Sequence, residues 1–133
     1  VLEALTEQIQ PREFVIEKTP VSYEPISLPQ GKLTLLYMFA RLQEFLKEKD
    51  VLIADTGIIP NGVSQMKFPK DSELVTQTLW GSIGWATPAT LGISLATENK
   101  RVILFTGEGS HQLTAMELGN MLHLQYLAQD LSY

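Results

Sequence analysis

The chain has 133 residues, a formal net charge of −5 and no cysteine. Without cysteine, disulfides, thiolate nucleophiles and zinc–thiolate sites are excluded, and two histidines are too few for a multi-histidine metal site. The acidic balance, with no basic stripe, argues against nucleic acid or an anionic membrane surface as a partner. No run approaches the roughly 18 apolar residues of a membrane span. The acidic first residues lack the basic start and apolar core of a signal peptide, so we expect a cytoplasmic protein.

The beginning of the chain is predicted to be a short helix followed by a linker. Apolar residues recur at helical spacing over 1–10, and Pro11 ends this pattern. Several prolines within 11–30, with no sustained helical period, favour an extended connector. We therefore expect residues 1–10 to be the end of a preceding domain and residues 11–30 to be a linker.

A helix and a strand are predicted next. Large apolar side chains between Leu35 and Leu46 fall on one face of a helix at about 32–48. The apolar run at 51–54 then predicts a short buried strand, which ends at Asp55-Thr56-Gly57.

The middle of the chain is predicted to contain turns and one further helix. Pro60-Asn61-Gly62 holds an Asn-Gly pair that favours a turn, and Pro69 marks a second turn. After Trp80-Gly81-Ser82-Ile83-Gly84, the small and apolar residues at 86–95 suit a helix packed closely against a sheet. Pro88 fits this helix only within its first turn.

A second apolar strand is predicted at 102–106, followed by a glycine turn and a helix at about 112–124 with Ser110 as its N-cap. These are the only two convincing strands in the sequence. The alternation of helices and strands predicts an α/β fold with a mostly parallel sheet. Its ligand site is expected at the carboxyl ends of the strands, where Asp55-Thr56-Gly57 and Gly107-Glu108-Gly109 both fall.

The motifs at these ends could carry chemistry, and each also has a purely structural interpretation. The turn Gly107–Ser110 could hold a metal-bound phosphate through its backbone and the Glu108 carboxylate, or it could be a plain turn. The segment Trp80–Gly84 could present backbone groups to a ring, or it could be a helix entry with a core tryptophan. Asp55-Thr56 could bond a ligand or cap the next segment. His111 could act as an acid–base group, or it could be an exposed histidine.

Taken together, these segments resemble the thiamine-diphosphate-dependent 2-oxo acid decarboxylases, in particular the pyruvate and indolepyruvate decarboxylase group. The resemblance is carried by VLIADTG at 51–57, TLWGSIGWATPATLG at 78–92 and KRVILFTGEGSHQLTAMEL at 100–118. It implies a partial three-layer parallel sheet of the thiamine-diphosphate-binding fold, preceded by a linker. Residues 31–133 would form the first half of the C-terminal diphosphate-binding domain.

The same resemblance implies a function. The chain would be a fragment of a cytoplasmic, flavin-independent lyase that uses thiamine diphosphate and Mg²⁺ to release CO₂ from pyruvate or an aromatic pyruvate. The intact protein would be a homodimer or homotetramer. In this family the activating glutamate lies in an N-terminal domain, so the chain alone is predicted to be inactive, and none of its residues is assigned a catalytic role.

Four residues would surround the organic part of the cofactor. The resemblance implies that Gly81 offers its carbonyl to the aminopyrimidine amino group and that Ile83 holds the cofactor in its bent shape. Ser82 would shape the pyrimidine pocket, and Thr56 would line the site.

The second glycine motif would hold the diphosphate and the metal ion. The resemblance implies that Gly109 and Ser110 contact the diphosphate, and that Glu108 stands where the family has an aspartate ligand of Mg²⁺. The extra methylene of Glu108 moves its carboxylate by roughly 1.5 Å, whereas Mg²⁺ requires ligand distances of about 2.0–2.1 Å. With this shift, Glu108 would contact the ion either directly or through a water molecule.

Two alternatives remain open at this point. A non-catalytic relative that binds the cofactor or a protein partner as a regulator would account for Gly-Glu-Gly in place of Gly-Asp-Gly. An unrelated nucleotide-binding α/β domain would instead require a complete parallel sheet within these residues.

Overall fold

The computed structural model describes Tyr23 and residues 32–97 and 99–130. The predicted helix at 1–10 lies outside the described residues, as does the predicted linker apart from Tyr23. In chain order the elements are α2 (Leu35–Phe45), β1 (Val51–Ala54), α3 (Ile58–Val63), β2 (Glu73–Thr76), α4 (Ala86–Ala96), β3 (Val102–Phe105), α5 (Glu108–Leu113) and α6 (Glu117–Asp130). None of the described helices is long and apolar enough to cross a membrane.

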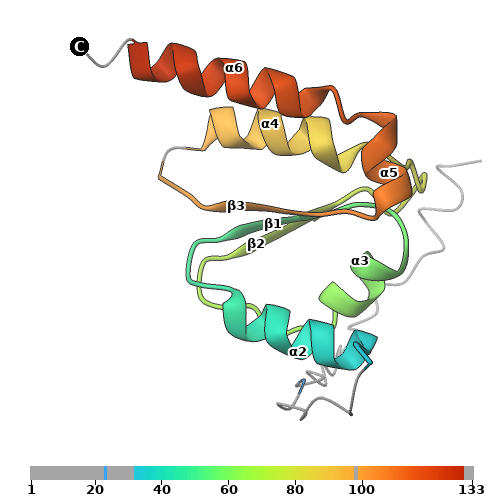
Figure 1. Ribbon diagram of the computed structural model, residues 1–133. Helices are drawn as coiled ribbons and strands as arrows, with labels where there is room; N and C mark the ends of the chain where they lie inside the picture. Colours follow the sequence, from blue (N-terminus) through green and yellow to red (C-terminus); the bar gives the residue numbers. More distant parts are fainter. Residues whose placement is uncertain (1–22, 24–31, 98, 131–133) are drawn as a thin grey trace, which may run out of the picture.

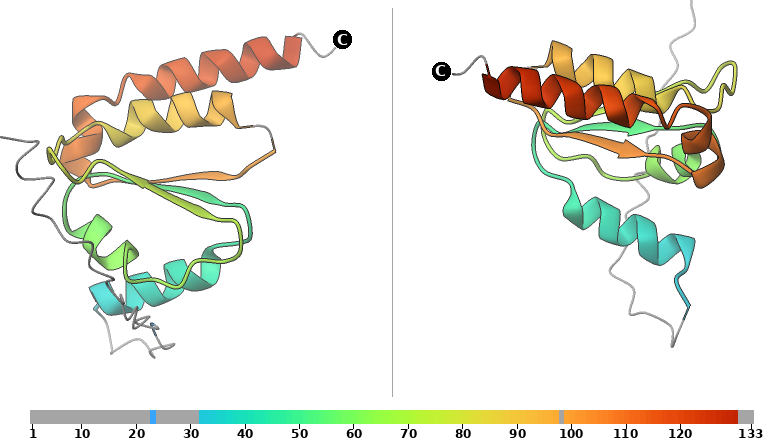
Figure 2. Two further views of the ribbon diagram at one scale, coloured as in Figure 1. Left: turned by 180° about the vertical axis from the view of Figure 1, so that it is seen from behind. Right: turned by 45° about the horizontal axis from the view of Figure 1, so that its top comes forward.

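The three strands form a parallel sheet in the order β2-β1-β3. Val51 of the central strand β1 is paired with Glu73 of β2 on one side and with Val102 of β3 on the other. The sheet is the middle of three layers, with α4 and α6 over one face and α2 and α3 over the other (Figure 1). The two further views show the same arrangement (Figure 2). The predicted α/β fold with a partial three-layer parallel sheet is confirmed.

Side chains alternate between the two faces of the sheet, as the period of a strand requires. Leu52 joins the apolar cluster under α2 and α3, which also contains Phe39 and Leu42. Val51 and Ile53 join the cluster on the α4 face. The four residues of β1 are all buried, because this strand has a neighbour on each side and helices on both faces.

The helices at 35–45 and 86–96 lie where the sequence predicts them, although the first is shorter than expected. It begins after Thr34, whose hydroxyl accepts a hydrogen bond from the Tyr37 N–H. Leu35, predicted to lie on the buried face, is 51% exposed. Pro88 lies in the first turn of α4, the one part of a helix that tolerates proline.

Two elements differ from the sequence prediction in the segment after β1. The predicted turn at Pro60-Asn61-Gly62 lies within the short helix α3, where Pro60 occupies the first turn. The strand β2, which the sequence analysis did not identify, adds a third member to the sheet. The predicted turn at Pro69 is confirmed, since the N–H of Ser72 donates to the Pro69 carbonyl at 3.3 Å.

The end of the described chain also differs from prediction. The segment after β3 forms two helices instead of one at 112–124, and Ser110 is a buried residue inside α5 rather than an N-cap. Gly107 occupies the N-cap position of α5. The helix ends at Thr114, whose hydroxyl donates to the Gly84 carbonyl at 2.8 Å, so a contact with a distant turn accompanies the break.

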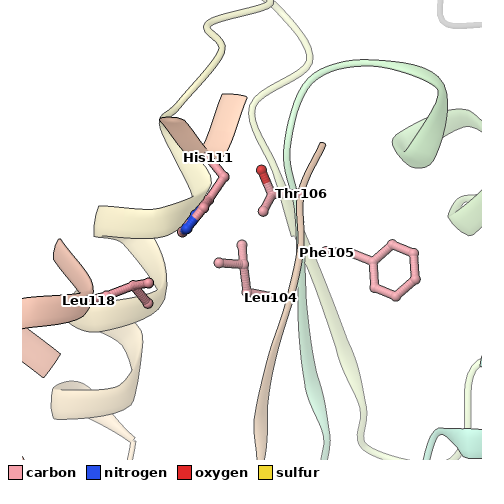
Figure 3. A pocket seen from close by; sticks show the side chains of 5 residues that line it. All are labelled: Leu104, Phe105, Thr106, His111 and Leu118. Carbon is pink, nitrogen blue, oxygen red and sulfur yellow. The ribbon is translucent and has the colours of Figure 1, made fainter. Parts of the chain in front are cut away.

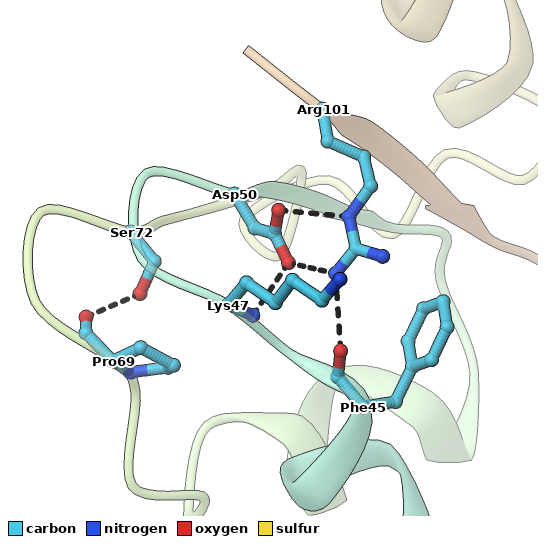
Figure 4. A network of polar contacts seen from close by, with 6 residues as sticks. All are labelled: Phe45, Lys47, Asp50, Pro69, Ser72 and Arg101. Carbon is cyan, nitrogen blue, oxygen red and sulfur yellow. Dashed lines mark hydrogen bonds and ion pairs between the residues drawn. The ribbon is translucent and has the colours of Figure 1, made fainter.

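A polar network ties the amino ends of β1 and β3 to the end of α2 (Figure 4). Nε of Arg101 donates to Oδ1 of Asp50 at 2.9 Å, and the N–H of Lys47 donates to Oδ2 of Asp50 at 2.8 Å. The Arg101 guanidinium also donates to the Phe45 carbonyl at 3.0 Å and lies 4.5 Å from the centre of the Phe45 ring. The hydrogen bond from Arg101 holds the pKa of the Asp50 carboxyl below its usual value, and burial opposes this shift. The network fixes the end of the sheet opposite to the predicted ligand site.

Candidate cofactor site

The candidate site lies where the connections of two neighbouring strands leave in opposite directions. After β1 the chain enters α3 on one face, and after β3 it passes through α5 to α6 on the other face (Figure 1). In an open parallel sheet the crevice at such a point, outside the carboxyl ends of the strands, is where ligands bind. The segments predicted from the sequence therefore lie at the expected place in the fold.

Asp55 joins the carboxyl ends of β1 and β3. Its side chain is buried, its Oδ1 accepts a hydrogen bond from the Thr56 N–H at 2.8 Å, and its Oδ2 accepts from the Thr106 hydroxyl at 3.2 Å. Both carboxylate oxygens thus bond within the chain. Asp55 therefore holds the ends of β1 and β3 together. It does not cap α3, whose N-cap is Gly57.

Thr56 and Ser82, both predicted to bind the cofactor, are brought together by the fold. The Thr56 hydroxyl donates to the Ser82 carbonyl oxygen at 3.2 Å and also faces the Gln77 carbonyl oxygen at 3.5 Å. The contact joins the end of β1 to the glycine turn that precedes α4. The Thr56 side chain therefore supports the backbone of this turn.

The glycine turn Gly81–Gly84 packs directly against α5. Gly81 and Gly84 have φ angles of +60° and +80°, in the left-handed region that glycine tolerates without strain. A Cβ on Gly84 would lie 2.9 Å from Cβ of Leu113 and 3.2 Å from the carbonyl oxygen of Ser110. The two glycine motifs identified in the sequence are therefore in contact, and Gly84 is needed both for the turn and for this close approach.

Large apolar side chains are exposed at and before this turn. Leu79, Trp80 and Ile83 are 90%, 84% and 56% exposed. The interpretation of Trp80 as a core tryptophan is wrong. Packing within the described chain does not account for Ile83, so its side chain is free to contact a ligand.

The second glycine motif begins α5. Glu108 and Gly109 are exposed and lie in the first turn of the helix, where backbone N–H groups have no acceptor within the helix. A Cβ built on Gly109 would meet no atom within 4 Å, and its φ is not positive. Neither packing nor strain therefore accounts for this glycine, although glycine inside a helix costs about 1 kcal/mol relative to alanine.

Glu108 is the one carboxylate within the motif Gly107–Ser110, and it is exposed. Among the residues that the structure describes, no group of three or more histidine or acidic side chains could hold one. Mg²⁺ in nucleotide-like sites is typically held by one or two carboxylates together with substrate phosphates and water. A site with one exposed carboxylate, such as Glu108, would fit this pattern if a bound diphosphate supplied the phosphate oxygens.

Two adjoining hollows lie at the carboxyl ends of β1 and β2. One, of about 150 Å³, is lined by Thr56, Gly57, Pro60, Asn61, Gln77 and Thr78. The other, of about 320 Å³, is lined by residues 76–80, and within the described chain the buried hydroxyl of Thr76 has no hydrogen-bond partner there. Thr56, Gly57 and Trp80 belong to motifs that the sequence placed at the ligand site, whereas Gln77 at the end of β2 was not predicted, because β2 was not recognised.

A third hollow of about 430 Å³ lies beside the edge strand β3 and contains none of the predicted cofactor residues. Its lining is Leu104, Phe105, Thr106, His111 and Leu118. The His111 ring points toward Leu104 and Leu118, whereas the Phe105 side chain extends from the other face of the strand (Figure 3). His111 is half-buried, with Nδ1 3.5 Å from the Thr87 hydroxyl, and is not the exposed histidine of the structural interpretation.

Comparison with known proteins agrees with the geometry. Residues 55–126 match the model of the thiamine pyrophosphate enzyme C-terminal TPP binding domain. Pyruvate decarboxylase isozyme 1 and isozyme 3 of Saccharomyces cerevisiae are 48% and 46% identical over 115 and 110 residues, which cover 75% and 79% of this chain. Pyruvate decarboxylase of Hanseniaspora uvarum is 35% identical over 132 residues. The aligned parts are 20%, 19% and 23% of the lengths of these relatives, so the chain spans about a fifth of each. With more than half of its residues matched, the chain belongs to the family of C-terminal TPP binding domains of thiamine pyrophosphate enzymes.

Proposed function

We propose that this chain supplies part of the cofactor site of a thiamine-diphosphate- and Mg²⁺-dependent decarboxylase that acts on pyruvate or an aromatic pyruvate. The observation that carries the proposal is the packing of turn Gly81–Gly84 against α5 at the carboxyl ends of β1 and β3. The family match and the names of the similar pyruvate decarboxylases support the same activity. They do not support an unrelated nucleotide-binding domain.

The described residues fit the organic part of the cofactor. Gly81 follows the hollow lined by residues 76–80, and its positive φ turns the backbone sharply there. Its carbonyl would accept from the aminopyrimidine, and the exposed Ile83 would support the bent cofactor from below. When bound, thiamine diphosphate supplies the electron sink for decarboxylation. The chain's own residues bind and orient it.

The diphosphate end would lie at α5. The N–H groups of Gly109 and Ser110 would bond phosphate oxygens, and Glu108 would hold Mg²⁺ directly or through water. The substrate would be recognised mainly by other parts of a complete enzyme. We further propose that this enzyme is a cytoplasmic homodimer or homotetramer and that the chain alone is inactive.

A thermal-shift titration of the complete enzyme tests the cofactor site. Thiamine diphosphate with Mg²⁺ should stabilise the fold by about 2.7 kcal/mol at a free concentration of about 100 times Kd. Thiamine without phosphates is the matched control and should stabilise much less, because it cannot reach Gly109 and Ser110. No stabilisation by thiamine diphosphate at saturating concentrations would contradict the proposal.

A non-catalytic regulator is the second candidate function, and Glu108 is the observation that favours it. If Glu108 is a working but imperfect ligand, Glu108→Asp should tighten the apparent affinity for Mg²⁺ by about tenfold and raise decarboxylase activity. Glu108→Gln, which keeps the length and removes the charge, should weaken both. Steady-state assays over a range of Mg²⁺ concentrations measure these effects. Full activity of the wild type rules out the regulator, whereas no activity in either wild type or Glu108→Asp contradicts the decarboxylase.

A further inference from the structure

Gln77 holds the backbone of the turn Gly81–Gly84 from the end of β2. It follows this strand directly and is half-buried. Its side-chain Oε1 accepts a hydrogen bond from the N–H of Ser82 at 3.1 Å. The side chain therefore bonds the turn that carries the proposed contacts to the aminopyrimidine.

The hydrogen bond from Ser82 to Gln77 also determines where the Gly81 carbonyl points. The N–H of Ser82 and the carbonyl of Gly81 belong to the same peptide, which is planar and trans, so the two groups point in opposite directions. Gln77, by accepting from this N–H, fixes the direction of the Gly81 carbonyl. Gly81 has φ +60°, and a glycine there has access to other backbone conformations unless a contact selects one.

The next peptide is fixed in a similar way. The Thr56 hydroxyl donates to the Ser82 carbonyl at 3.2 Å and also faces the Gln77 carbonyl at 3.5 Å. Both backbone groups of Ser82 are thus bonded within the chain, one by Gln77 and one by Thr56. The Gly81 carbonyl and the Ile83 N–H belong to the same two peptides. They therefore point away from Gln77 and Thr56.

We propose that Gln77 is a positioning residue of the cofactor site, which aims the Gly81 carbonyl at the aminopyrimidine of thiamine diphosphate. The inference rests on the proposed function. Without the acceptor at Gln77, the peptide between Gly81 and Ser82 rotates more freely, and the cofactor must order it on binding. We expect Gln77→Met to raise the Kd for thiamine diphosphate about three- to tenfold, the effect of losing one hydrogen bond.

The test uses three variants of the complete enzyme. Gln77→Met keeps the side-chain length and removes the acceptor, whereas Gln77→Glu keeps an acceptor oxygen. Gln43→Met is the matched control, because Oε1 of Gln43 accepts from the Lys67 N–H at 2.9 Å in the same kind of contact, on α2 and away from the turn. Titration calorimetry with Mg²⁺ present gives the Kd for thiamine diphosphate, and amide hydrogen exchange reports the Ser82 N–H without cofactor.

The expected result has two parts. Gln77→Met alone weakens binding and speeds exchange at Ser82, and Gln77→Glu restores slow exchange. Equal Kd values for Gln77→Met and wild type, equal weakening by Gln77→Met and Gln43→Met, or unchanged exchange at Ser82 would each overturn the inference while leaving the proposed function intact. Failure of the wild type to bind would instead overturn the proposed function and the inference that rests on it.

Discussion

Replacement of Gly62 by alanine should destabilise the chain by about 3 kcal/mol or more, at the upper end of overpacking effects. A Cβ at this position would lie 2.1–2.6 Å from three atoms of the Phe39 ring. Phe39 cannot move aside easily, because it is 4% exposed, belongs to the cluster under β1 and packs against the Tyr23 ring with ring centres 5.8 Å apart. The Tyr23 hydroxyl also donates to the Gly62 carbonyl at 3.1 Å.

Gly92→Ala is the matched control for this prediction. Gly92 also lies in a helix, α4, but a Cβ there would meet no atom within 4 Å, so alanine should stabilise the chain by about 0.5–1 kcal/mol. Urea denaturation followed by circular dichroism measures both free energies of unfolding. Adding Phe39→Leu to Gly62→Ala should recover part of the loss. Equal stability of Gly62→Ala and Gly92→Ala would show that the contact with Phe39 does not carry the effect.

Gly62 also shows why part of the fold could not be predicted. Its Asn-Gly pair is typical of a turn, yet the segment is helical and packed under an aromatic ring that lies 23 positions earlier. By contrast, β1 was evident because four consecutive apolar residues are buried on both faces. The strand β2 was missed because Glu73 and Thr76 limit its apolar residues to two, whereas β1 and β3 are each four consecutive apolar residues.

The segments that meet at the candidate site were recognisable in the sequence, whereas the contacts between them were not. The glycine motifs were recognised from local sequence, since tight turns and close approach leave a local signature. The hydrogen bonds from Thr56 to Ser82 and from Ser82 to Gln77 depend on which strands become neighbours, and no spacing in the sequence reveals that. Sequence reasoning therefore identified Thr56 and Ser82 but gave Gln77 no role.

Replacement of Asp50 by alanine should destabilise the chain by about 2–3 kcal/mol at neutral pH, the range for charge-assisted hydrogen bonds at a buried group. Asp50 is 3% exposed and accepts from both Arg101 and the Lys47 N–H. Its removal leaves the Arg101 guanidinium without its carboxylate and the end of α2 without a contact to β1. Glu73→Ala is the control, because the pair of Glu73 with Lys100 lies at the surface and such pairs contribute little.

The effect of Asp50→Ala should also depend on pH, with a definite sign. Arg101 lowers the pKa of folded Asp50 below its usual value near 3.8, so folding favours the ionised carboxylate. This stabilisation is fully present above the pKa of the unfolded chain and is lost as the pH falls through the lower pKa of the folded chain. The difference in unfolding free energy between wild type and Asp50→Ala should therefore be constant from about pH 7 to 5 and shrink below about pH 4. Urea titrations across this range measure it, and a difference that grows toward acid would contradict the assigned ion pair.

Because the network lies at the amino ends of the strands, Asp50→Ala should lower stability without changing the Kd for thiamine diphosphate in the folded protein, in contrast to Gln77→Met at the carboxyl ends.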